Sequence, residues 1–479
     1  MAMKVFEVDF GEIGKEVSLR FDVDFVSFNK IDTKETYSFK DLFEIQSFSK
    51  IARLALLESL EDKDFYYSEI GHATKQGDVD PIKLNFEHRD ELSENYFCKI
   101  EKGDIQKAEK NNILIAKVRP NLKKYIFVDE EHSNYFYTTA FINIKPKKLN
   151  KVLYYAIRRV FYDNLMAISR QGKSYPTINE NDFTYLKFNK HLIDSLESDQ
   201  DNIISKIEPI EKRIKEFKAS IKQPQEVINK VFAREFGFDL EKFEEVKKIG
   251  NYYLDLASFG NNIDIRNSVK FHKEAGQFVI GNLKRIGQKK IKNYISEPIV
   301  LGKGISPTEY DENGDFYYIS MANIKNWVFE AEDSKLVSTN YSNQNLNKTV
   351  TKGDVLIARS GEGTIGKVAL VEDENVQGIF ADFIMRIRLK NYNPLFAYYY
   401  FRTTYFQYLI EINKKGLGNN TNIFPSQIQE FPIIDIPLNY QQKIVDEIKS
   451  ELDRQEELKQ QIIRQRDEID KLITASLTT

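Results

Sequence analysis

The chain has 479 residues, a formal net charge of −3, 41% hydrophobic residues and 29% charged residues. This length is too great for one ordinary core and fits two domains of about 200 residues each, joined by helices. The near-neutral charge argues against a protein that coats nucleic acid by bulk attraction, although clustered Lys and Arg side chains could still form local phosphate-binding surfaces.

The cysteine content and the hydropathy pattern point to a reducing compartment. Cys98 is the single cysteine, which excludes an internal disulfide and a structural zinc site built from thiolates. The first residues contain no apolar signal segment, and no later run approaches the roughly 18 apolar residues of a membrane span. We therefore expect a cytoplasmic protein with no membrane partner.

The first half of the chain alternates between helical and strand-like patterns. Apolar residues at helical spacing, β-branched runs and turn residues distinguish the three kinds of element. The predicted elements are, in order, a helix over 40–60, strands beginning at Phe65 and covering 112–118 and 125–128, an aromatic-rich helix over 152–168 and a loop over 171–176.

A long helix then starts near Asp199 and leads into the second half. Pro209 lies inside it and predicts a kink or a later start, while Gln223-Pro224 predicts an interruption before a shorter helix over 225–236 that ends at Gly237. The remaining predicted elements are strands over 316–324, 354–359 and 367–371, an aromatic helix over 395–412 and a loop over 416–422.

The last stretch of the chain, 440–477, has a seam of residues that repeats every seven positions. The seam consists of Ile444, Ile448, Glu451, Gln455, Leu458, Ile462, Gln465, Ile469 and Leu472. Such a repeat is typical of a long helix that packs against another helix. The first long helix offers a matching seam in Ile203, Ile207, Ile210, Ile214, Phe217 and Ile221.

Three pairs of similar segments indicate an internal duplication. Asp-Phe-Tyr-Tyr occurs at 64–67 and 315–318, Ile-Leu-Ile-Ala-Lys at 113–117 is matched by 355–359, and the seams begin at Ile203 and Ile444. The offsets are 251, 242 and 241 residues, in the same order along the chain. Ordered matches at nearly one offset predict two similar halves, each with a globular unit followed by a long helix.

We therefore predict an α+β fold with two duplicated mixed α/β domains, whose long helices pair as an antiparallel coiled coil. The predicted boundaries are 1–198 for the first domain, 199–236 for its helix, 237–439 for the second domain and 440–479 for its helix. In this arrangement the helices act as a spacer between two equivalent units, which suits the recognition of two half-sites on a DNA duplex.

Patterns that resemble catalytic motifs do not have the context that catalysis needs. The Gly-rich segment 360–368 leads into a strand, whereas a phosphate-binding loop opens a helix. Asn393-Pro394 suits a helix cap better than a methyltransferase tetrad, and the five histidines have no metal-ligand spacing. We expect a non-catalytic chain without a cofactor or a metal of its own.

The second half also resembles the DNA-specificity (S) subunit of type I restriction-modification systems. The most telling matches are Lys-Gly-Asp-Val-Leu-Ile-Ala-Arg at 352–359, Gly-Thr-Ile-Gly-Lys at 363–367, Asn-Ile-Phe-Pro-Ser-Gln-Ile at 422–428 and Gln-Gln-Lys-Ile-Val at 441–445. The first half departs from this pattern, because Gln-Asp-Asn-Ile at 200–203 replaces the second Gln-Gln and the glycine turn is lost.

The resemblance implies that each half is a target-recognition domain that reads one part of a bipartite DNA target. It also implies that the helices bind two copies of a methyltransferase (modification) subunit, which would carry S-adenosylmethionine, and that a motor-nuclease restriction subunit can join the complex. The helix positions expected to serve partner binding are Ile207, Ile214, Ile221, Ile448, Leu458, Ile462 and Ile469.

Candidate DNA contacts lie on the loops that follow strands and on the Gly-rich loops. Arg and Asn side chains suit bidentate contacts with guanine and adenine, and Lys suits phosphate. The candidates are Lys117, Arg119, Lys123, Lys173 and Tyr175 in the first half, and Arg359, Lys367, Lys414, Lys415, Asn419 and Asn420 in the second half.

Three other interpretations remain open from the sequence. A coiled-coil scaffold without DNA binding explains the helices but not the duplicated domains with basic strand loops. An enzyme, either a nuclease or a methyltransferase, would need a site that the sequence does not offer. A specificity subunit of a type II system, whose partner fuses nuclease and methylase, fits the same residues.

Overall fold

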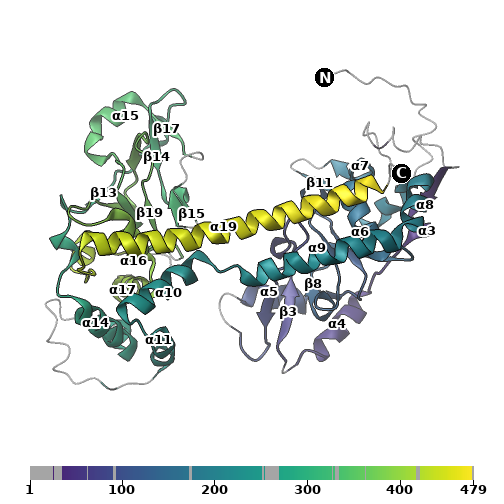
Figure 1. The fold of residues 1–479 in the computed structure, drawn as a ribbon, viewed down its shortest axis with the longest axis horizontal. Helices are drawn as coiled ribbons and strands as arrows, with labels where there is room; N and C mark the ends of the chain where they lie inside the picture. The colour runs from purple at the N-terminus through teal and green to yellow at the C-terminus, as the bar shows by residue number, and fades with distance from the viewer. Residues whose placement is uncertain are drawn as a thin grey trace. The chain divides into compact units, whose positions relative to one another are not determined.

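The fold comes from a computed structural model. The structure describes residues 25, 35–61, 63–89, 93–171, 175–250, 253, 269–325, 327–329, 334–361, 363–416 and 421–476. The chain divides into two units (Figure 1), Met1–Ala219 with Gln460–Thr479, and Ser220–Lys459. Each unit is a mixture of helices and small sheets, which confirms the predicted α+β class.

The first unit contains two four-stranded sheets whose strands are rich in β-branched and aromatic residues. The order of the first sheet is β2 (Phe43–Ile45), β9 (Phe141–Pro146), β6 (Ile113–Ala116) and β7 (Tyr125–Phe127), all antiparallel. The order of the second sheet is β4 (Ile82–Leu84), β3 (Phe65–Ser68), β8 (Phe136–Tyr137) and β5 (Gln106–Lys107), with β3 and β8 parallel.

Two short ribbons and a set of helices complete the first unit. The ribbons are β1 (Thr36–Ser38) with β12 (Lys187–Asn189), and β10 (Arg170–Gln171) with β11 (Pro176–Thr177). The helices are α3 (Phe39–Leu42), α4 (Lys50–Glu58), α5 (Glu94–Glu101), α6 (Asn150–Arg159), α7 (Tyr162–Ile168), α8 (Lys190–Ser198) and α9 (Gln200–Ser220).

The second unit repeats this plan of strands. Its first sheet has the order β13 (Val300–Leu301), β21 (Ile384–Ile387), β18 (Val355–Ala358) and β19 (Val368–Leu370), again antiparallel. Its second sheet has the order β17 (Leu336–Val337), β14 (Phe316–Ile319) and β20 (Gly378–Phe380), and β15 (Ile324–Lys325) pairs with β16 (Val328–Phe329).

Helices surround the aromatic core of the second unit. They are α10 (Pro224–Phe236), α11 (Leu240–Lys247), α13 (Val269–His272), α14 (Glu274–Ile286), α15 (Thr339–Gln344), α16 (Pro394–Arg402), α17 (Thr404–Asn413), α18 (Pro425–Gln429) and the long helix α19 (Leu438–Ala475). Phe232 of α10, Phe396 of α16 and Tyr405 of α17 are fully buried in one cluster with strands β18 and β21. The burial of large rings stabilises this unit.

The two strand plans share their central pairings, although the second sheet has four strands in the first unit and three in the second. In both units a central strand, β6 or β18, forms a hairpin with the next strand of its sheet and pairs on its other side with a later strand, β9 or β21. In both units the Phe-Tyr-Tyr strand, β3 or β14, pairs in parallel with a later strand. The predicted duplication is therefore confirmed by the topology.

In each unit, contacts with α19 run in opposite chain directions. In the second unit, the Lys222 N–H donates to Gln455 Oε1 at 2.8 Å and Arg234 pairs with Glu447 at 2.6 Å. Residue numbers thus increase along 222–234 while the numbers of their partners on α19 decrease. In the first unit, the Ser195 hydroxyl donates to the Ser476 carbonyl at 3.0 Å, while Lys218 and Arg466 both donate to Asp78. These directions agree with an antiparallel arrangement, while knobs-into-holes pairing stays a prediction.

Several helix ends follow from the sequence. Helix α10 begins at Pro224 and is terminated by Gly237 at φ 67°, a conformation that favours glycine. Asn393 caps α16, because its side chain accepts from the Leu395 and Phe396 N–H groups. Helix α9 starts at Gln200 and continues through Pro209, so a later start is excluded.

Other helix predictions were wrong. Residues 40–60 form α3, the strand β2 and α4 in place of one helix, because pairing with β9 outweighs the helical periodicity of this segment. The predicted helix over 395–412 is split at Thr403, whose hydroxyl accepts the Phe406 N–H and begins α17. The predicted helix over 152–168 is likewise split, into α6 and α7.

Candidate nucleic-acid interface

The end of β6 in the first unit is held by two neighbouring segments. The Lys117 N–H donates to the Ala140 carbonyl and the Lys117 carbonyl accepts from the Ile178 N–H, both at 2.9 Å. Val118 then forms an isolated bridge with Thr177. The backbone of Lys117 is thereby fixed on both sides at the point where the strand leaves the sheet.

The end of β18 in the second unit has the same construction. The Arg359 N–H donates to the Phe383 carbonyl and the Arg359 carbonyl accepts from the Ile423 N–H, both at 2.9 Å. Ser360 bridges Asn422, as Val118 bridges Thr177. Lys117 and Arg359 therefore occupy equivalent positions, as the duplicated sequence predicts.

An arginine lies over an aromatic ring near this strand end in both units, although Arg119 follows Lys117, the equivalent of Arg359, by two residues. The Arg119 guanidinium carbon is 5.1 Å from the centre of the Tyr175 ring, and Arg359 is 5.5 Å from the Phe424 ring. Tyr175 and Phe424 are 41% and 37% exposed. A guanidinium that rests on a ring keeps its N–H edges directed outward, which suits bidentate contact with guanine or phosphate.

Arg359 is only partly satisfied within the chain. One terminal nitrogen donates to Asn422 Oδ1 at 3.2 Å, and Nε has no hydrogen-bond partner among the described residues. A buried N–H without an acceptor carries a desolvation cost of about 1–3 kcal/mol. The side chain is therefore in a state that an added acceptor would stabilise.

Lys117 is engaged in an ion pair with Glu180 at 2.7 Å. Burial opposes the charge of Glu180, but the hydrogen bond from Lys117, a backbone hydrogen bond and the charge of Lys117 together outweigh burial and lower the pKa of the carboxyl. A phosphate would have to compete with this carboxylate for the Lys117 ammonium.

Two other predicted lysines point into the chain. Lys123 donates to the Arg158 carbonyl at 3.0 Å and lies 4.1 Å from the centre of the Tyr162 ring, and burial together with the charge of Arg158 lowers its pKa. The Lys414 side chain is 12% exposed and pairs with Glu411 at 2.7 Å. Neither ammonium has the exposure that a phosphate contact requires.

The other candidates are placed by their backbone, or lie in segments that are not described. Lys415 is exposed, and its backbone exchanges two 2.7 Å hydrogen bonds with Asn422. The Lys367 N–H donates to the Thr364 carbonyl where the Gly-rich turn enters β19. Lys173, Asn419 and Asn420 lie outside the described residues. The role of every candidate in DNA contact stays a prediction.

Two exposed aromatic residues beside Arg359 were missed from the sequence. Phe383 is 48% exposed and shares the backbone hydrogen bond with Arg359, and Phe424 lies under the guanidinium. Aligning the two halves along their strands would have placed Phe383 opposite Ala140. The sequence alone does not distinguish these two exposed rings from the buried Phe380 and Phe431 in neighbouring segments.

The helix positions predicted for partner binding are mostly covered within the chain itself. Ile207, Ile214, Ile448, Ile462 and Ile469 are buried, while Ile221 and Leu458 are half-buried. These side chains contribute to packing inside the chain, and their part in binding a partner stays a prediction.

The described residues contain no group of three or more His, Cys, Asp or Glu side chains that could hold a metal ion. Within the same residues, no helix is both long enough and apolar enough to span a membrane.

A family model matches residues 298–465, and its description is the type I restriction modification DNA specificity domain. No curated protein matches the chain. Three solved structures are similar at low identity. A chain from a study of complex assembly in a type I restriction-modification system is 15% identical, with 92% of this chain and 96% of that chain covered and a TM-score of 0.44.

The HsdS subunit of Thermoanaerobacter tengcongensis is 16% identical, with 92% of this chain and 95% of that chain covered and a TM-score of 0.35. The type I S subunit of M. genitalium is 13% identical, with 93% and 97% covered and a TM-score of 0.41.

The matched domain includes β18, the Gly-rich turn, Arg359 and most of α19, which are the segments on which the resemblance was based. Residues 298–465 are therefore similar to the type I restriction modification DNA specificity domain.

Proposed function

We propose that the chain recognises a bipartite DNA target, one part with each unit, and directs a methyltransferase and a restriction subunit to that target. The observation that supports this proposal is the repeated strand end, where Arg119 lies over Tyr175 and Arg359 lies over Phe424. An arginine over an exposed ring near the same strand end of each unit suits two half-sites, although Arg359 itself corresponds to Lys117.

In this function the chain supplies recognition and its partners supply chemistry. Arg119 and Arg359 would contact base edges or phosphates in the grooves, and the exposed rings of Tyr175, Phe383 and Phe424 would pack on sugars or bases. S-adenosylmethionine would be bound by the methyltransferase, and two copies of that subunit would assemble with one copy of this chain.

Half-site recognition can be tested by removing one arginine at a time. We expect Arg359→Ala to weaken binding by about 1–3 kcal/mol and to relax base preference in one half of the target only, and Arg119→Ala to act on the other half. The measurement is selection from a randomised DNA library by the complex of the chain with its co-encoded methyltransferase.

Arg213→Ala provides a matched control, since Arg213 is an exposed arginine of α9 that lies outside both strand ends. The control complex should select the wild-type motif. An unchanged motif with both Arg119→Ala and Arg359→Ala would contradict the assignment of these residues. Recovery of a fused nuclease–methylase as the partner would assign the chain to a type II system.

A further inference from the structure

Each unit contains a pocket at an equivalent place, with a volume of about 720 Å³ in the first unit and about 960 Å³ in the second. Both pockets are lined by a Tyr-Tyr-x-x-Arg segment from the equivalent helix, α6 or α16. The matched lining residues are Tyr154 and Tyr398, Tyr155 and Tyr399, and Arg158 and Arg402.

The first pocket is crossed by contacts within the chain. Asp78, on the turn after β3, accepts from both Lys218 of α9 and Arg466 of α19. Arg158 donates to the carbonyls of Lys75 at 2.6 Å and Lys123 at 2.8 Å. Asp78 thus joins the turn to α9 and α19, and the Arg158 guanidinium has carbonyl acceptors within the chain.

The turn that lines the second pocket has a different chemistry. Gly77 at φ 89° and Trp327 at φ 65° mark the same point of the two turns, after equivalent short helical segments. Gly77, Asp78 and Val79 are therefore replaced by Trp327, Val328 and Phe329. Val328 is 52% exposed, where Asp78 forms its two ion pairs in the first unit. The second unit therefore has an exposed apolar side chain where the first unit has the ion-paired Asp78 carboxylate.

Arg402 lacks the acceptors that Arg158 has. Its side chain lines the second pocket, is 5% exposed, and donates from one terminal nitrogen to the Tyr398 hydroxyl at 2.7 Å. The guanidinium lies 5.5 Å from the Trp327 ring. Its Nε has no partner within the described part of the chain. An occupant with a carbonyl oxygen would satisfy this donor.

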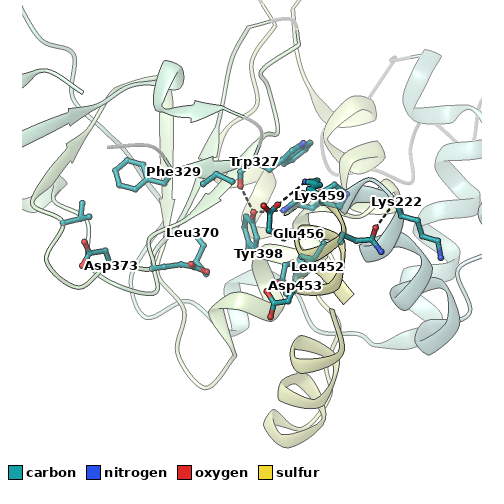
Figure 2. Close-up of a pocket in the computed structure, with 17 residues that line it drawn as sticks. Lys222, Trp327, Phe329, Leu370, Asp373, Tyr398, Leu452, Asp453, Glu456 and Lys459 are labelled. Carbon is teal, nitrogen blue, oxygen red and sulfur yellow. Dashed lines mark hydrogen bonds and ion pairs between the residues drawn. The ribbon is translucent and has the colours of Figure 1, made fainter. Parts of the chain in front are cut away.

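Carboxylates line the second pocket from two sides (Figure 2). Glu372 and Asp373 follow β19, and Asp453 and Glu456 belong to α19. Burial, the neighbouring Tyr398 and the carboxylates Glu372 and Asp453 raise the pKa of Tyr399, which also lines the pocket. Lys222 and Lys459 are the cations of the rim, and Lys459 pairs with Glu456 at 3.4 Å.

The equivalent walls of the first pocket have opposite charges. Lys215 of α9 pairs there with Glu131 of the domain at 3.5 Å. The corresponding position on α19 is Glu456, which lines the second pocket together with Glu372. Because carboxylates lie both after β19 and on α19 in the second pocket, a cation from a partner could be attracted between them.

We propose that the pocket of the second unit is the docking site for a partner polypeptide segment that carries an apolar side chain beside a lysine or arginine. The apolar side chain packs among Trp327, Val328 and Phe329, a backbone carbonyl accepts from Arg402, and the basic side chain lies between Glu372 and Asp453. This proposal does not depend on DNA recognition.

The single tryptophan of the chain, Trp327, reports directly on the pocket. The test titrates the full chain with an acetylated, amidated hexapeptide of alternating leucine and arginine and follows Trp327 fluorescence at low salt. We expect a saturable spectral shift that weakens as salt rises, and no shift with the hexapeptide of alternating leucine and glutamate. An equal response to both peptides, or no response, would overturn the proposal.

Two variants and a control connect the signal to this pocket. Glu372→Gln with Asp453→Asn, and separately Val328→Asp, should each raise the peptide dissociation constant by about tenfold, because they remove charge partners or apolar contact. Glu312→Gln with Asp315→Asn changes the same charge at exposed residues outside the pocket lining and should leave the constant unchanged. Equal constants for all three variants would overturn the proposal.

Discussion

At the scale of single residues, Asp78 joins the turn after β3 to two helices of the first unit. It is half-buried and accepts from a cation on each of two helices. Burial works against its charge, but Arg466 and Lys218 outweigh burial and lower its pKa. A lowered carboxyl pKa means that the stabilisation is present above the ordinary range near pH 4 and is lost as pH falls through the folded-state value.

We expect Asp78→Asn to reduce the free energy of unfolding by about 1–3 kcal/mol at pH 7, since two cations lose their partner. The difference from the wild type should shrink as pH falls below 4. Chemical denaturation at pH 7 and pH 3 measures this. Glu109→Gln, which breaks the exposed pair with Lys145, should cost under about 1 kcal/mol; an equal loss in the two variants would contradict the role of Asp78.

At the scale of elements, the break between α9 and α10 depends on one buried glutamine of α19. Gln455 is 3% exposed, accepts from the Lys222 N–H at 2.8 Å and donates to Glu451 at 2.8 Å. It thereby satisfies a backbone donor that the end of α9 leaves without a helical acceptor. A polar residue in the seam fixes the register of α19 against this break.

Gln455→Leu should lower the free energy of unfolding by about 1 kcal/mol, because the Lys222 N–H loses its acceptor. Gln465→Leu is the matched control in the same seam. The Gln465 carbonyl oxygen has no partner among the described residues, so leucine there should be neutral or stabilising. Thermal unfolding of both variants checks the difference, and a larger loss for Gln465→Leu would contradict it.

The elements that the sequence predicted are those with a long period or a distinctive end residue. The seam helices, the stop at Gly237 and the Asn393 cap follow from spacing and residue type. The strand β2 could not be foreseen, because three residues form it only through pairing with β9. The inward direction of Lys123 likewise depends on Arg158, which lies on a distant helix. Glu411, in contrast, precedes Lys414 by one helical turn, so helical spacing could have indicated that ion pair.

At the scale of the whole molecule, the two units share some features and differ in others. Both units keep the strand order, the pairing at the end of the central strand and an arginine over an aromatic ring. They differ in the pocket turn, where Asp78 in one unit corresponds to Val328 in the other. The shared features suit a common task in DNA recognition, and the different ones suit unequal contacts with partner proteins.

The central claim is that one chain reads two half-sites with two equivalent units. The most direct measurement is the DNA motif that the chain selects from a randomised library when it is purified with its co-encoded methyltransferase. We predict two short blocks of fixed sequence separated by a constant, unspecified spacer, bound with strong salt dependence. A single uninterrupted motif, or no base preference at moderate salt, would contradict the claim.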